Sequence, residues 1–318
     1  MTISVIIATL HRDNDLEVLF KSFLTQSLMP SEIIVVDQSD DERTKNLCQN
    51  YKKNLPLKYF HCSVKSASYC RNYGVERSEG EIIAFLDDDT KLDPDYIKSV
   101  DAFYREHPQA LGGMSRIINY GEFREKLLGK GFLYIMYKTI ASIFGLNSFK
   151  KGFIVLPSSR NLDLYEAENT LEVQWLSTCN CWVKKTIFDE FRFEEKFKKW
   201  SFGEDRMWSY QIYKKYPGTL FFYPKAALFH FESSRNRMLE EDKIFMKVTY
   251  QFWFSWSCVE GNKFFYWWAN TGEIVLHFLN AMIRREPFIN SWYYIKANIK
   301  LLGHMKRIKK GDLNFIED

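Results

Sequence analysis

Three aspartates stand side by side at positions 87–89, directly after a run of apolar residues. Adjacent carboxylates repel one another unless a cation or water offsets their charge. On an extended segment alternate side chains share a side, so we expect Asp87 and Asp89 to point one way and Asp88 the other. Mg²⁺ or Mn²⁺ binds one or two carboxylates and completes its shell with waters and phosphate oxygens. The cluster therefore indicates either a site for a metal-bound diphosphate or a solvated acidic turn.

The first third of the chain alternates between apolar runs and segments with helical periodicity. The expected strands are residues 3–8, 32–37, 57–61 and 82–87, and the helical segments between them are 15–26, 41–54 and 66–78. This order predicts βαβ units with a mostly parallel sheet. Ligands bind such sheets at the carboxyl ends of the strands. Thr9, Asp37 and the three aspartates leave their strands there, so we expect polar groups to gather at one edge.

The remaining two thirds are less regular. Further strands are expected at residues 110–119, 173–185, 219–224 and 227–231, and a helix at 203–216. Residues 120–172 have the character of an insertion that includes a helix at 131–145. From about residue 238 the chain predicts three helices crowded with aromatic residues, at 243–258, 263–285 and 290–310, with basic clusters near their ends.

Composition restricts the class of protein. The chain has 318 residues, of which 46% are hydrophobic, and this suits a folded globular protein. A net charge of +4 is too small to argue for nucleic-acid binding. The amino terminus lacks the features of a secretory leader, and no stretch approaches the ~20 apolar residues of a spanning helix. The six cysteines show no disulfide or zinc spacing, so we expect reduced thiols and a cytoplasmic location.

Two other enzyme classes also place acidic residues after a strand. Aspartate phosphatases want Thr or Val two residues after the second aspartate of their motif, whereas Lys91 stands there, and their motif lies on the first strand. Nucleotidyltransferases that act on sugar phosphates usually have a glycine-rich basic loop after the first strand, and the segment TLHRDN contains no glycine. Both interpretations are less favoured than a diphosphate site.

An ordered set of five segments carries a family resemblance. These are ISVIIATLHR, IIVVDQSDD, SASYCRNYGVERSEGEIIAFLDDDTKLDPDYI, STCNCWVKKTIFDE and FGEDRMWSYQI. Together they resemble the family 2 glycosyltransferases, which are inverting enzymes with the GT-A fold. The resemblance implies an α/β fold with helices on both faces of the sheet. It also implies a catalytic domain over residues 1–235, with 120–172 as an acceptor-side insertion, and a helical extension over 236–318.

The resemblance implies a UDP- or dTDP-sugar donor and Mn²⁺ or Mg²⁺ as cofactor. Thr9 would lie beside the base, and Asp37 would accept a hydrogen bond from the base ring, unless it only closes a turn. Ser68 and Arg71, one helical turn apart, would face the base or the diphosphate. Asp87 would contact ribose or the metal, Asp88 would support the sugar or ribose, and Asp89 would be the metal ligand.

The acceptor side rests on the GED motif. In the family the second acidic residue takes the proton of the acceptor hydroxyl, so Asp205 would be the general base. Glu204 would bind the acceptor or the donor sugar, and the pair could also cap the helix. His230 would be a further metal or diphosphate ligand. Trp175 and Trp200 either stack on a sugar or belong to the core.

The tail leaves two interpretations open. Its interleaved aromatic and basic residues suit a peripheral attachment to the cytoplasmic face of the inner membrane, which would match a lipid-linked glycan acceptor. Alternatively, the helices pack on the core or on a second copy of the chain, giving a homo-oligomer. The alternative to catalysis is a non-catalytic protein that binds nucleotide sugars or carbohydrates on the same fold. Loss of the base carboxylate would favour it, and Asp205 is present.

Overall fold

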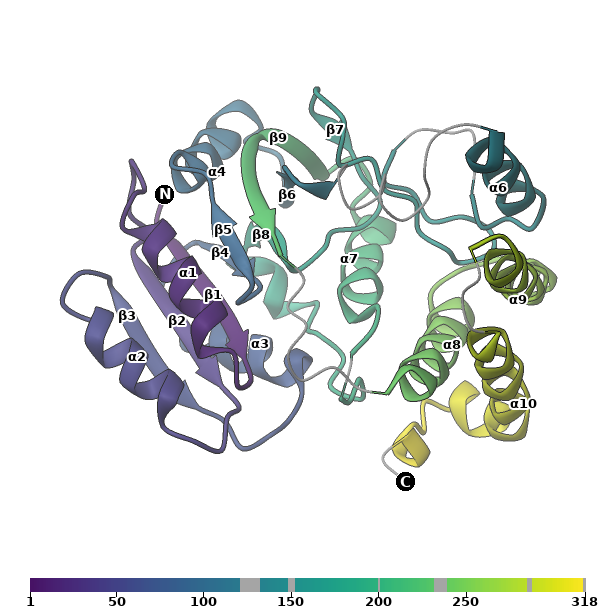
Figure 1. The fold of residues 1–318 in the computed structure, drawn as a ribbon. Helices are drawn as coiled ribbons and strands as arrows, with labels where there is room; N and C mark the ends of the chain where they lie inside the picture. The colour runs from purple at the N-terminus through teal and green to yellow at the C-terminus, as the bar shows by residue number, and fades with distance from the viewer. Residues whose placement is uncertain (121–131, 148–151, 200, 232–238, 285–287, 317–318) are drawn as a thin grey trace. The chain divides into compact units, whose positions relative to one another are not determined.

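The computed structural model describes residues 1–318 except 121–131, 148–151, 200, 232–238, 285–287 and 317–318 (Figure 1). The chain divides into two compact units. The first, which we call the sheet unit, comprises Met1–Gly121, Tyr165–Glu195 and Trp208–Asn236. The second, the helical unit, comprises Glu122–Leu164, Lys196–Met207 and Arg237–Asp318.

The sheet unit is built on one mixed β-sheet. Within the described residues the order of its strands is β3-β2-β1-β4-β8-β6-β9-β5, and β7 pairs with β9 off this path. The strands are β1 (Ile3–Thr9), β2 (Glu32–Asp37), β3 (Leu57–His61), β4 (Ile82–Leu86), β5 (Thr90–Leu92), β6 (Gly112–Ile117), β7 (Leu171–Glu172), β8 (Asn180–Lys184) and β9 (Leu220–His230). The α/β fold class predicted from the sequence is confirmed. Strand β1 pairs in parallel with both β2 and β4, and β2 pairs in parallel with β3. Strands β6 and β9 form a further parallel pair.

The apolar runs form the buried centre of this sheet. Every residue of β2 and β4 is buried, as expected for strands covered on both faces. The register pairs Thr9 with Asp37 and Asp37 with His61, so the carboxyl ends of β1, β2 and β3 lie level. The expected gathering of polar residues at one edge of the sheet is therefore observed.

Helices connect the strands of the sheet unit. They are α1 (Asp13–Phe23), α2 (Arg43–Tyr51), α3 (Ala67–Glu76), α4 (Tyr96–Glu106), the 3₁₀ helix η1 (Lys185–Asp189) and α7 (Glu204–Lys215), which begins in the helical unit. The chain moves outward from β1 to β3 and then returns past β1 to β4. Right-handed crossovers therefore place α1 and α2 on one face of the sheet and α3 on the other (Figure 1).

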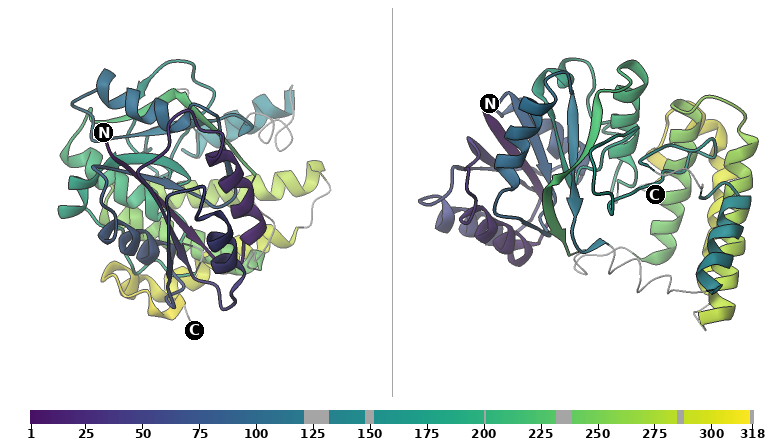
Figure 2. Two further views of the ribbon diagram at one scale, coloured as in Figure 1. Left: turned by 90° about the vertical axis from the view of Figure 1, so that its left-hand side faces the viewer. Right: turned by 90° about the horizontal axis from the view of Figure 1, so that it is seen from above.

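The helical unit is built from α6 (Phe132–Ile143), α8 (Glu240–Ser257), α9 (Phe264–Arg284), α10 (Ile289–Lys309) and a short 3₁₀ helix, η2 (Asn314–Ile316). Helix α10 packs on α8 and α9, and α6 packs on α9 (Figure 2). The three aromatic helices predicted for the tail are thus confirmed. None of the helices in the described part of the chain is both long and apolar enough to cross a membrane.

One expected pair of strands is a single element. The sequence predicts strands at 219–224 and 227–231, whereas the structure forms one strand, β9, over Leu220–His230. Pro224 lies within it, and proline cannot donate a hydrogen bond to a neighbouring strand. Strand β6 pairs with β9 on both sides of this point, with a register shift between Met114 and Arg116 that absorbs the irregularity.

Candidate active site

The three aspartates lie where β4 ends and the short strand β5 begins. Asp87 follows β4, and Asp88 and Asp89 form a turn rather than the extended segment that we expected. Thr90 Oγ1 donates a hydrogen bond to the Asp87 carbonyl at 2.8 Å and closes this turn. The turn still separates the side chains: Asp89 and Asp87 approach His230, whereas Asp88 pairs with Thr9.

His230 reaches the aspartates through strand pairing. The antiparallel register of β5 and β9 sets Thr90 opposite His230, and the Phe231 amide donates to the Asp89 carbonyl at 3.0 Å. Asn119 holds the backbone of His230 on its other side: its amide donates to the His230 carbonyl at 2.7 Å and accepts from the His230 amide at 3.0 Å. The imidazole is thus fixed beside Asp89, with Nε2 3.0 Å from Oδ1.

Asp87, Asp89 and His230 form a cluster that could hold a metal ion. Each offers one ligand atom, and these atoms all lie within 4.8 Å of one another. Asp89 is buried, and Asp87 and His230 are partly exposed. Two carboxylate oxygens and one imidazole nitrogen suit Mn²⁺, and the exposed side leaves room for phosphate oxygens and water. The residues present therefore fit the cofactor that the resemblance implies.

Asp88 points toward β1 rather than into this cluster. Its Oδ2 accepts a hydrogen bond from Thr9 Oγ1 at 2.7 Å, and its Oδ1 lies 3.0 Å from Arg12 Nη1. The pKa of Asp88 is raised to about 7, mainly by burial. The positive charge of Arg12 lowers this pKa, and the negative charge of Asp89 raises it. The same Arg12 nitrogen lies 3.4 Å from Asp89 Oδ2. Arg12 therefore offsets the charge of two adjacent aspartates.

Helix α3 carries Ser68 and Arg71, and Arg71 reaches Asp87 of the cluster. Ser66 caps this helix by accepting a hydrogen bond from the Tyr69 amide. Arg71 is nearly buried, with Nη2 3.3 Å from Asp87 Oδ1 and its guanidinium 5.7 Å from the centre of the Phe193 ring. Ser68 is fully buried, and its hydroxyl has no hydrogen-bond partner within the described residues. Arg71 is therefore placed to contact an anion held at Asp87.

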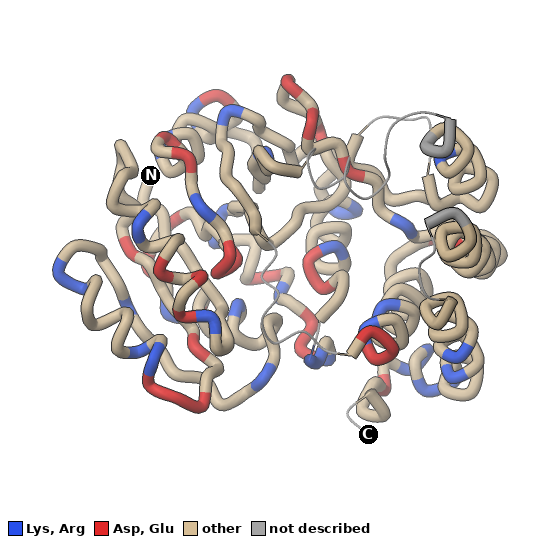
Figure 3. The backbone as a smooth tube through the Cα atoms, viewed as in Figure 1, with Lys and Arg blue, Asp and Glu red and all other residues tan. Residues whose placement is uncertain are grey.

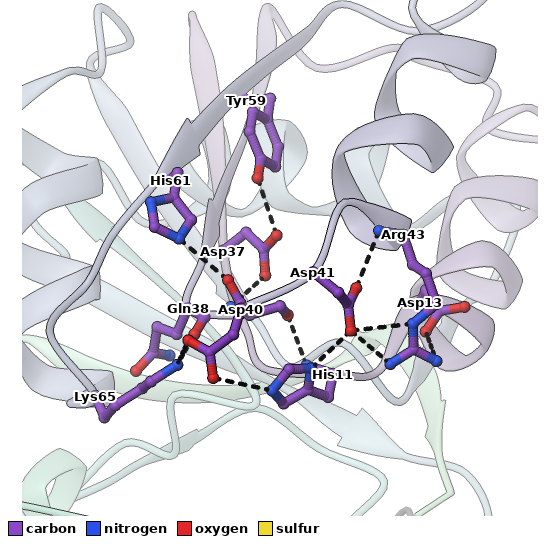
Figure 4. Close-up of polar contacts among 11 residues, drawn as sticks. His11, Asp13, Asp37, Gln38, Asp40, Asp41, Arg43, Tyr59, His61 and Lys65 are labelled. Atoms are coloured by element: carbon purple, nitrogen blue, oxygen red, sulfur yellow. Dashed lines mark hydrogen bonds and ion pairs between the residues drawn. The ribbon is translucent and has the colours of Figure 1, made fainter.

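Asp37 lies at the end of β2 and is fully buried. Its Oδ1 accepts from the Ser39 amide at 2.9 Å and its Oδ2 accepts from Tyr59 Oη at 3.0 Å (Figure 4). Ser39 Oγ in turn accepts from the His11 amide at 2.8 Å, which joins the loops after β1 and β2. These bonds are what a residue closing a turn would make. The contact to a nucleotide base stays a prediction.

A row of ion pairs, running from Lys65 through His11 to Arg43, lies beside this turn (Figure 4). His11 lies 3.1 Å from an Asp41 oxygen and 3.7 Å from an Asp40 oxygen, and Lys65 lies 2.8 Å from the other Asp40 oxygen. Arg43 also pairs with Asp41, at 2.9 Å. Because His11 has a positive φ of 54°, the loop after β1 turns sharply here. The two loops are thereby held together at the carboxyl edge of the sheet.

The predicted acceptor residues lie elsewhere in the chain. Glu204 and Asp205 begin α7, where acidic groups favour a helix amino terminus, and they belong to the helical unit. Asp205 Oδ1 accepts from the Arg206 amide at 2.7 Å. Trp175 is buried, as a core tryptophan would be, and Trp200 lies outside the described residues. The catalytic and acceptor roles of these residues stay predictions.

A cavity of about 560 Å³ lies at the opposite ends of the same strands. Its lining includes Thr2, Glu32, Leu57 and Gly80, which precede or begin β1, β2, β3 and β4. Ligands of α/β sheets bind at the carboxyl ends. We therefore place the candidate active site at the aspartates and not in this cavity.

Two contributing residues escaped the sequence interpretation. Arg12 could have been found, because it is a cation three residues beyond Thr9 at the edge where the aspartates gather. Asn119 could not, because nothing in its local sequence indicates that it faces His230, 111 residues further along the chain.

Comparison with known proteins identifies the family. The family model described as glycosyl transferase family 2 matches residues 4–167, and the chain therefore belongs to this family. One relative is the GalNAc(5)-diNAcBac-PP-undecaprenol beta-1,3-glucosyltransferase of Campylobacter jejuni, which is 28% identical over 198 residues. The match covers 58% of this chain and 63% of that relative, less than two thirds of its length.

Solved structures confirm the fold. Residues 1–349 of TarS from Staphylococcus aureus, in complex with UDP-GlcNAc, match with a TM-score of 0.57 at 15% identity, over 100% of this chain and 90% of that one. GalNAc-T7 with UDP, GalNAc and Mn²⁺ matches with a TM-score of 0.57 at 13% identity, over 86% of this chain and 54% of that one. At such identities the likeness bears on the fold, and it agrees with the expected GT-A architecture.

Proposed function

We propose that this chain is an inverting glycosyltransferase that moves a sugar from a UDP- or dTDP-sugar to a hydroxyl of a glycan or lipid-linked glycan. The observation that carries the proposal is the cluster of Asp87, Asp89 and His230 at the carboxyl edge of the sheet, in a chain of this family. A structural neighbour binds UDP-GlcNAc, another binds UDP with Mn²⁺, and the Campylobacter relative is named for a polyprenyl-linked substrate. These relatives support the choice of donor and acceptor.

In this proposal Asp87, Asp89 and His230 hold Mn²⁺ or Mg²⁺. When bound, the metal neutralises negative charge on the departing nucleoside diphosphate. Arg71 contributes a second positive charge, 3.3 Å from Asp87 Oδ1, and a guanidinium forms strong hydrogen bonds to phosphate oxygens. Thr9 and Arg12 hold the Asp88 carboxylate toward β1, so Asp88 is not among the proposed metal ligands.

Asp205 is the proposed general base. It accepts the proton of the acceptor hydroxyl while that oxygen attacks the anomeric carbon from the side opposite the leaving diphosphate, so the configuration inverts. Glu204 is proposed to bind the acceptor or the donor sugar. Asp37 is proposed to accept a hydrogen bond from the ring NH of uracil or thymine.

A donor panel tests the proposal. Purified protein is incubated with MnCl₂ and UDP-Glc, UDP-GlcNAc, UDP-GalNAc, dTDP-Glc or GDP-Man, and released nucleoside diphosphate is measured. We expect turnover of a UDP- or dTDP-sugar that falls at least a hundredfold in Asp89→Asn and in Asp205→Asn. Full activity in both variants would overturn the site. Binding without turnover of any donor would favour the non-catalytic alternative, and a response to GDP-Man alone would contradict the role of Asp37.

A further inference from the structure

Helix α9 has an inverted distribution of polarity. The polar residues in its middle face the interior of the helical unit: Asn270 is buried and its Nδ2 donates to Asn298 at 2.7 Å, while the Glu273 carboxylate lies 2.9 Å from Arg160 Nε. One turn further on, the His277 ring stacks on Tyr294. A helix on the surface of a globular protein normally shows the opposite arrangement, with its polar residues outward.

The outward face of α9 is apolar along its length. Residues 264, 268, 271, 275, 278 and 282 follow one another at alternating spacings of four and three, which places them on one stripe of the helix. They are Phe264, Trp268, Thr271, Val275, Phe278 and Met282. Phe264, Phe278 and Met282 are 57%, 49% and 60% exposed. Five of the six are apolar and none is charged, so this exposed stripe has the composition that is usual for the buried face of a helix.

The neighbouring helices extend this surface. On one side of α9, Trp268 Nε1 donates to the Ile143 carbonyl at 2.8 Å, and α6 exposes Ile135 and Ile143. Helix α10, which also packs on α9, exposes Trp292, Ile299 and Leu302. Single exposed apolar residues are ordinary, but several of them on helices that pack on one another are typical of an interaction surface. We call the exposed apolar residues of α6, α9 and α10 the apolar face.

Positive charge accompanies the apolar face. Residues 264–310 contain eight Lys or Arg and two Asp or Glu, whereas the rest of the chain carries a formal net charge of −2. Figure 3 shows α9 almost without charged residues and α10 with several basic ones. Helix α10 contains no acidic residue, and Lys306 in its last turn and Lys310 directly after it are both exposed. This combination suits a partner that is apolar and negatively charged at once.

We propose that α9 and α10 attach the helical unit to the surface of a lipid bilayer with anionic headgroups. The apolar face would lie at the boundary of headgroups and acyl chains, and the lysines of α10 would meet the phosphates. Tryptophans such as Trp268 and Trp292 favour this depth. A second copy of the chain is a poorer partner, because a symmetric interface would bring the basic residues of α10 together.

The test is flotation with vesicles of 70% phosphatidylcholine and 30% phosphatidylglycerol, compared with pure phosphatidylcholine. We expect the wild type to float with the anionic vesicles, and Phe278→Gln/Met282→Gln/Ile299→Gln to reduce the partition coefficient at least tenfold. The matched control, Val18→Gln/Leu24→Gln/Leu28→Gln, alters exposed apolar residues of the sheet unit and is expected to bind as the wild type does. Equal binding by the first triple variant and the wild type would overturn the proposal.

Lys306→Gln/Lys310→Gln tests the charge separately, with the apolar face intact. Near an anionic surface each lysine is worth roughly a fivefold change in binding, so we expect the loss of two to weaken partition by roughly 25-fold at low salt. A Met282→Cys variant labelled with an environment-sensitive dye reports on the face itself, since all six native cysteines are buried. Its emission should shift to the blue with anionic vesicles, and an unchanged emission, or dimerisation through this face without lipid, would contradict the proposal.

The inference rests on the lipid-linked acceptor proposed above, but vesicle binding is measured without donor or acceptor. A protein that turns over a nucleotide sugar and does not bind vesicles would overturn the membrane proposal alone. One that binds vesicles and turns over no donor would overturn the proposed function alone.

Discussion

Replacement of Glu273 by glutamine tests whether the interior of the helical unit depends on charge. Glu273 lies 2.9 Å from Arg160 Nε and 3.6 Å from Lys247 Nζ. Burial alone would raise the pKa of Glu273, but the charges of Arg160 and Lys247 outweigh burial and hold the pKa at about 2, below its ordinary value of 4.5. A neutral glutamine has nearly the volume of a protonated glutamate, so the shift in pKa converts into the expected loss of stability.

The magnitude depends on pH in a defined direction. A carboxyl whose folded-state pKa is depressed contributes stability that is complete above its unfolded pKa and disappears as the pH falls through its folded pKa. For values of about 2 and 4.5, Glu273→Gln should lower the free energy of unfolding by about 3 kcal/mol at pH 7 and by roughly half as much at pH 3.

Urea unfolding, followed by tryptophan fluorescence and circular dichroism at pH 7 and pH 3, measures this difference. Glu241→Gln is the matched control, because Glu241 pairs with Lys296 at 3.2 Å while both side chains are 46% exposed. An exposed pair contributes less than about 1 kcal/mol. A cost for Glu273→Gln that stays the same at both pH values, or that equals the control, would refute the reasoning.

Three further substitutions are expected to separate donor contact, metal ligation and packing. Arg71→Ala should raise the KM for the donor at least tenfold, because hydrogen bonds between charged groups are the stronger ones, whereas Arg77→Ala, directly after the same helix, should leave it unchanged. His230→Ala should weaken Mn²⁺ binding by tenfold or more in a metal titration. Gly272→Ala should lower the free energy of unfolding by about 1–3 kcal/mol, because the added Cβ would lie 2.2 Å from the Cβ of Phe144, the residue after α6. Gly303→Ala, whose Cβ meets nothing within 4 Å, should instead stabilise α10 by up to about 1 kcal/mol.

Each of these outcomes can fail on its own. If the Arg71 and Arg77 variants change KM equally, Arg71 acts through the fold of α3 and not through the donor. Unaltered Mn²⁺ affinity in His230→Ala would remove the imidazole from the proposed ligand set. If both glycine variants unfold at the same urea concentration, close approach of α6 to α9 does not determine the stability of the helical unit.

Local sequence pattern predicted the part of the fold that places the aspartates. The apolar runs that became β1, β2 and β4 end at Thr9, Asp37 and Asp87, and parallel strands necessarily align these ends. His230 came only from the family resemblance. Its place opposite Thr90 follows from the pairing of β5 with β9, and pairing across 140 residues leaves no local pattern in the sequence.

The character of α9 shows where pattern alone is insufficient. Its sequence indicates a helix rich in aromatic residues, but periodicity does not say which face turns inward. The choice is made by Arg160 and Lys247, which come from other segments and bind Glu273 from within the unit. The strand at 220–230 is a similar case, since pairing with β6 on both sides keeps the chain extended across Pro224.

The central claim is that Asp89 helps to hold a metal on which the donor diphosphate depends. Isothermal titration of UDP into the protein, with and without MnCl₂, tests it most directly in the wild type and in Asp89→Asn. We predict that Mn²⁺ strengthens UDP binding at least tenfold in the wild type and has no effect in the variant. Equal affinities for UDP with and without Mn²⁺, or an undiminished Mn²⁺ effect in Asp89→Asn, would contradict the account.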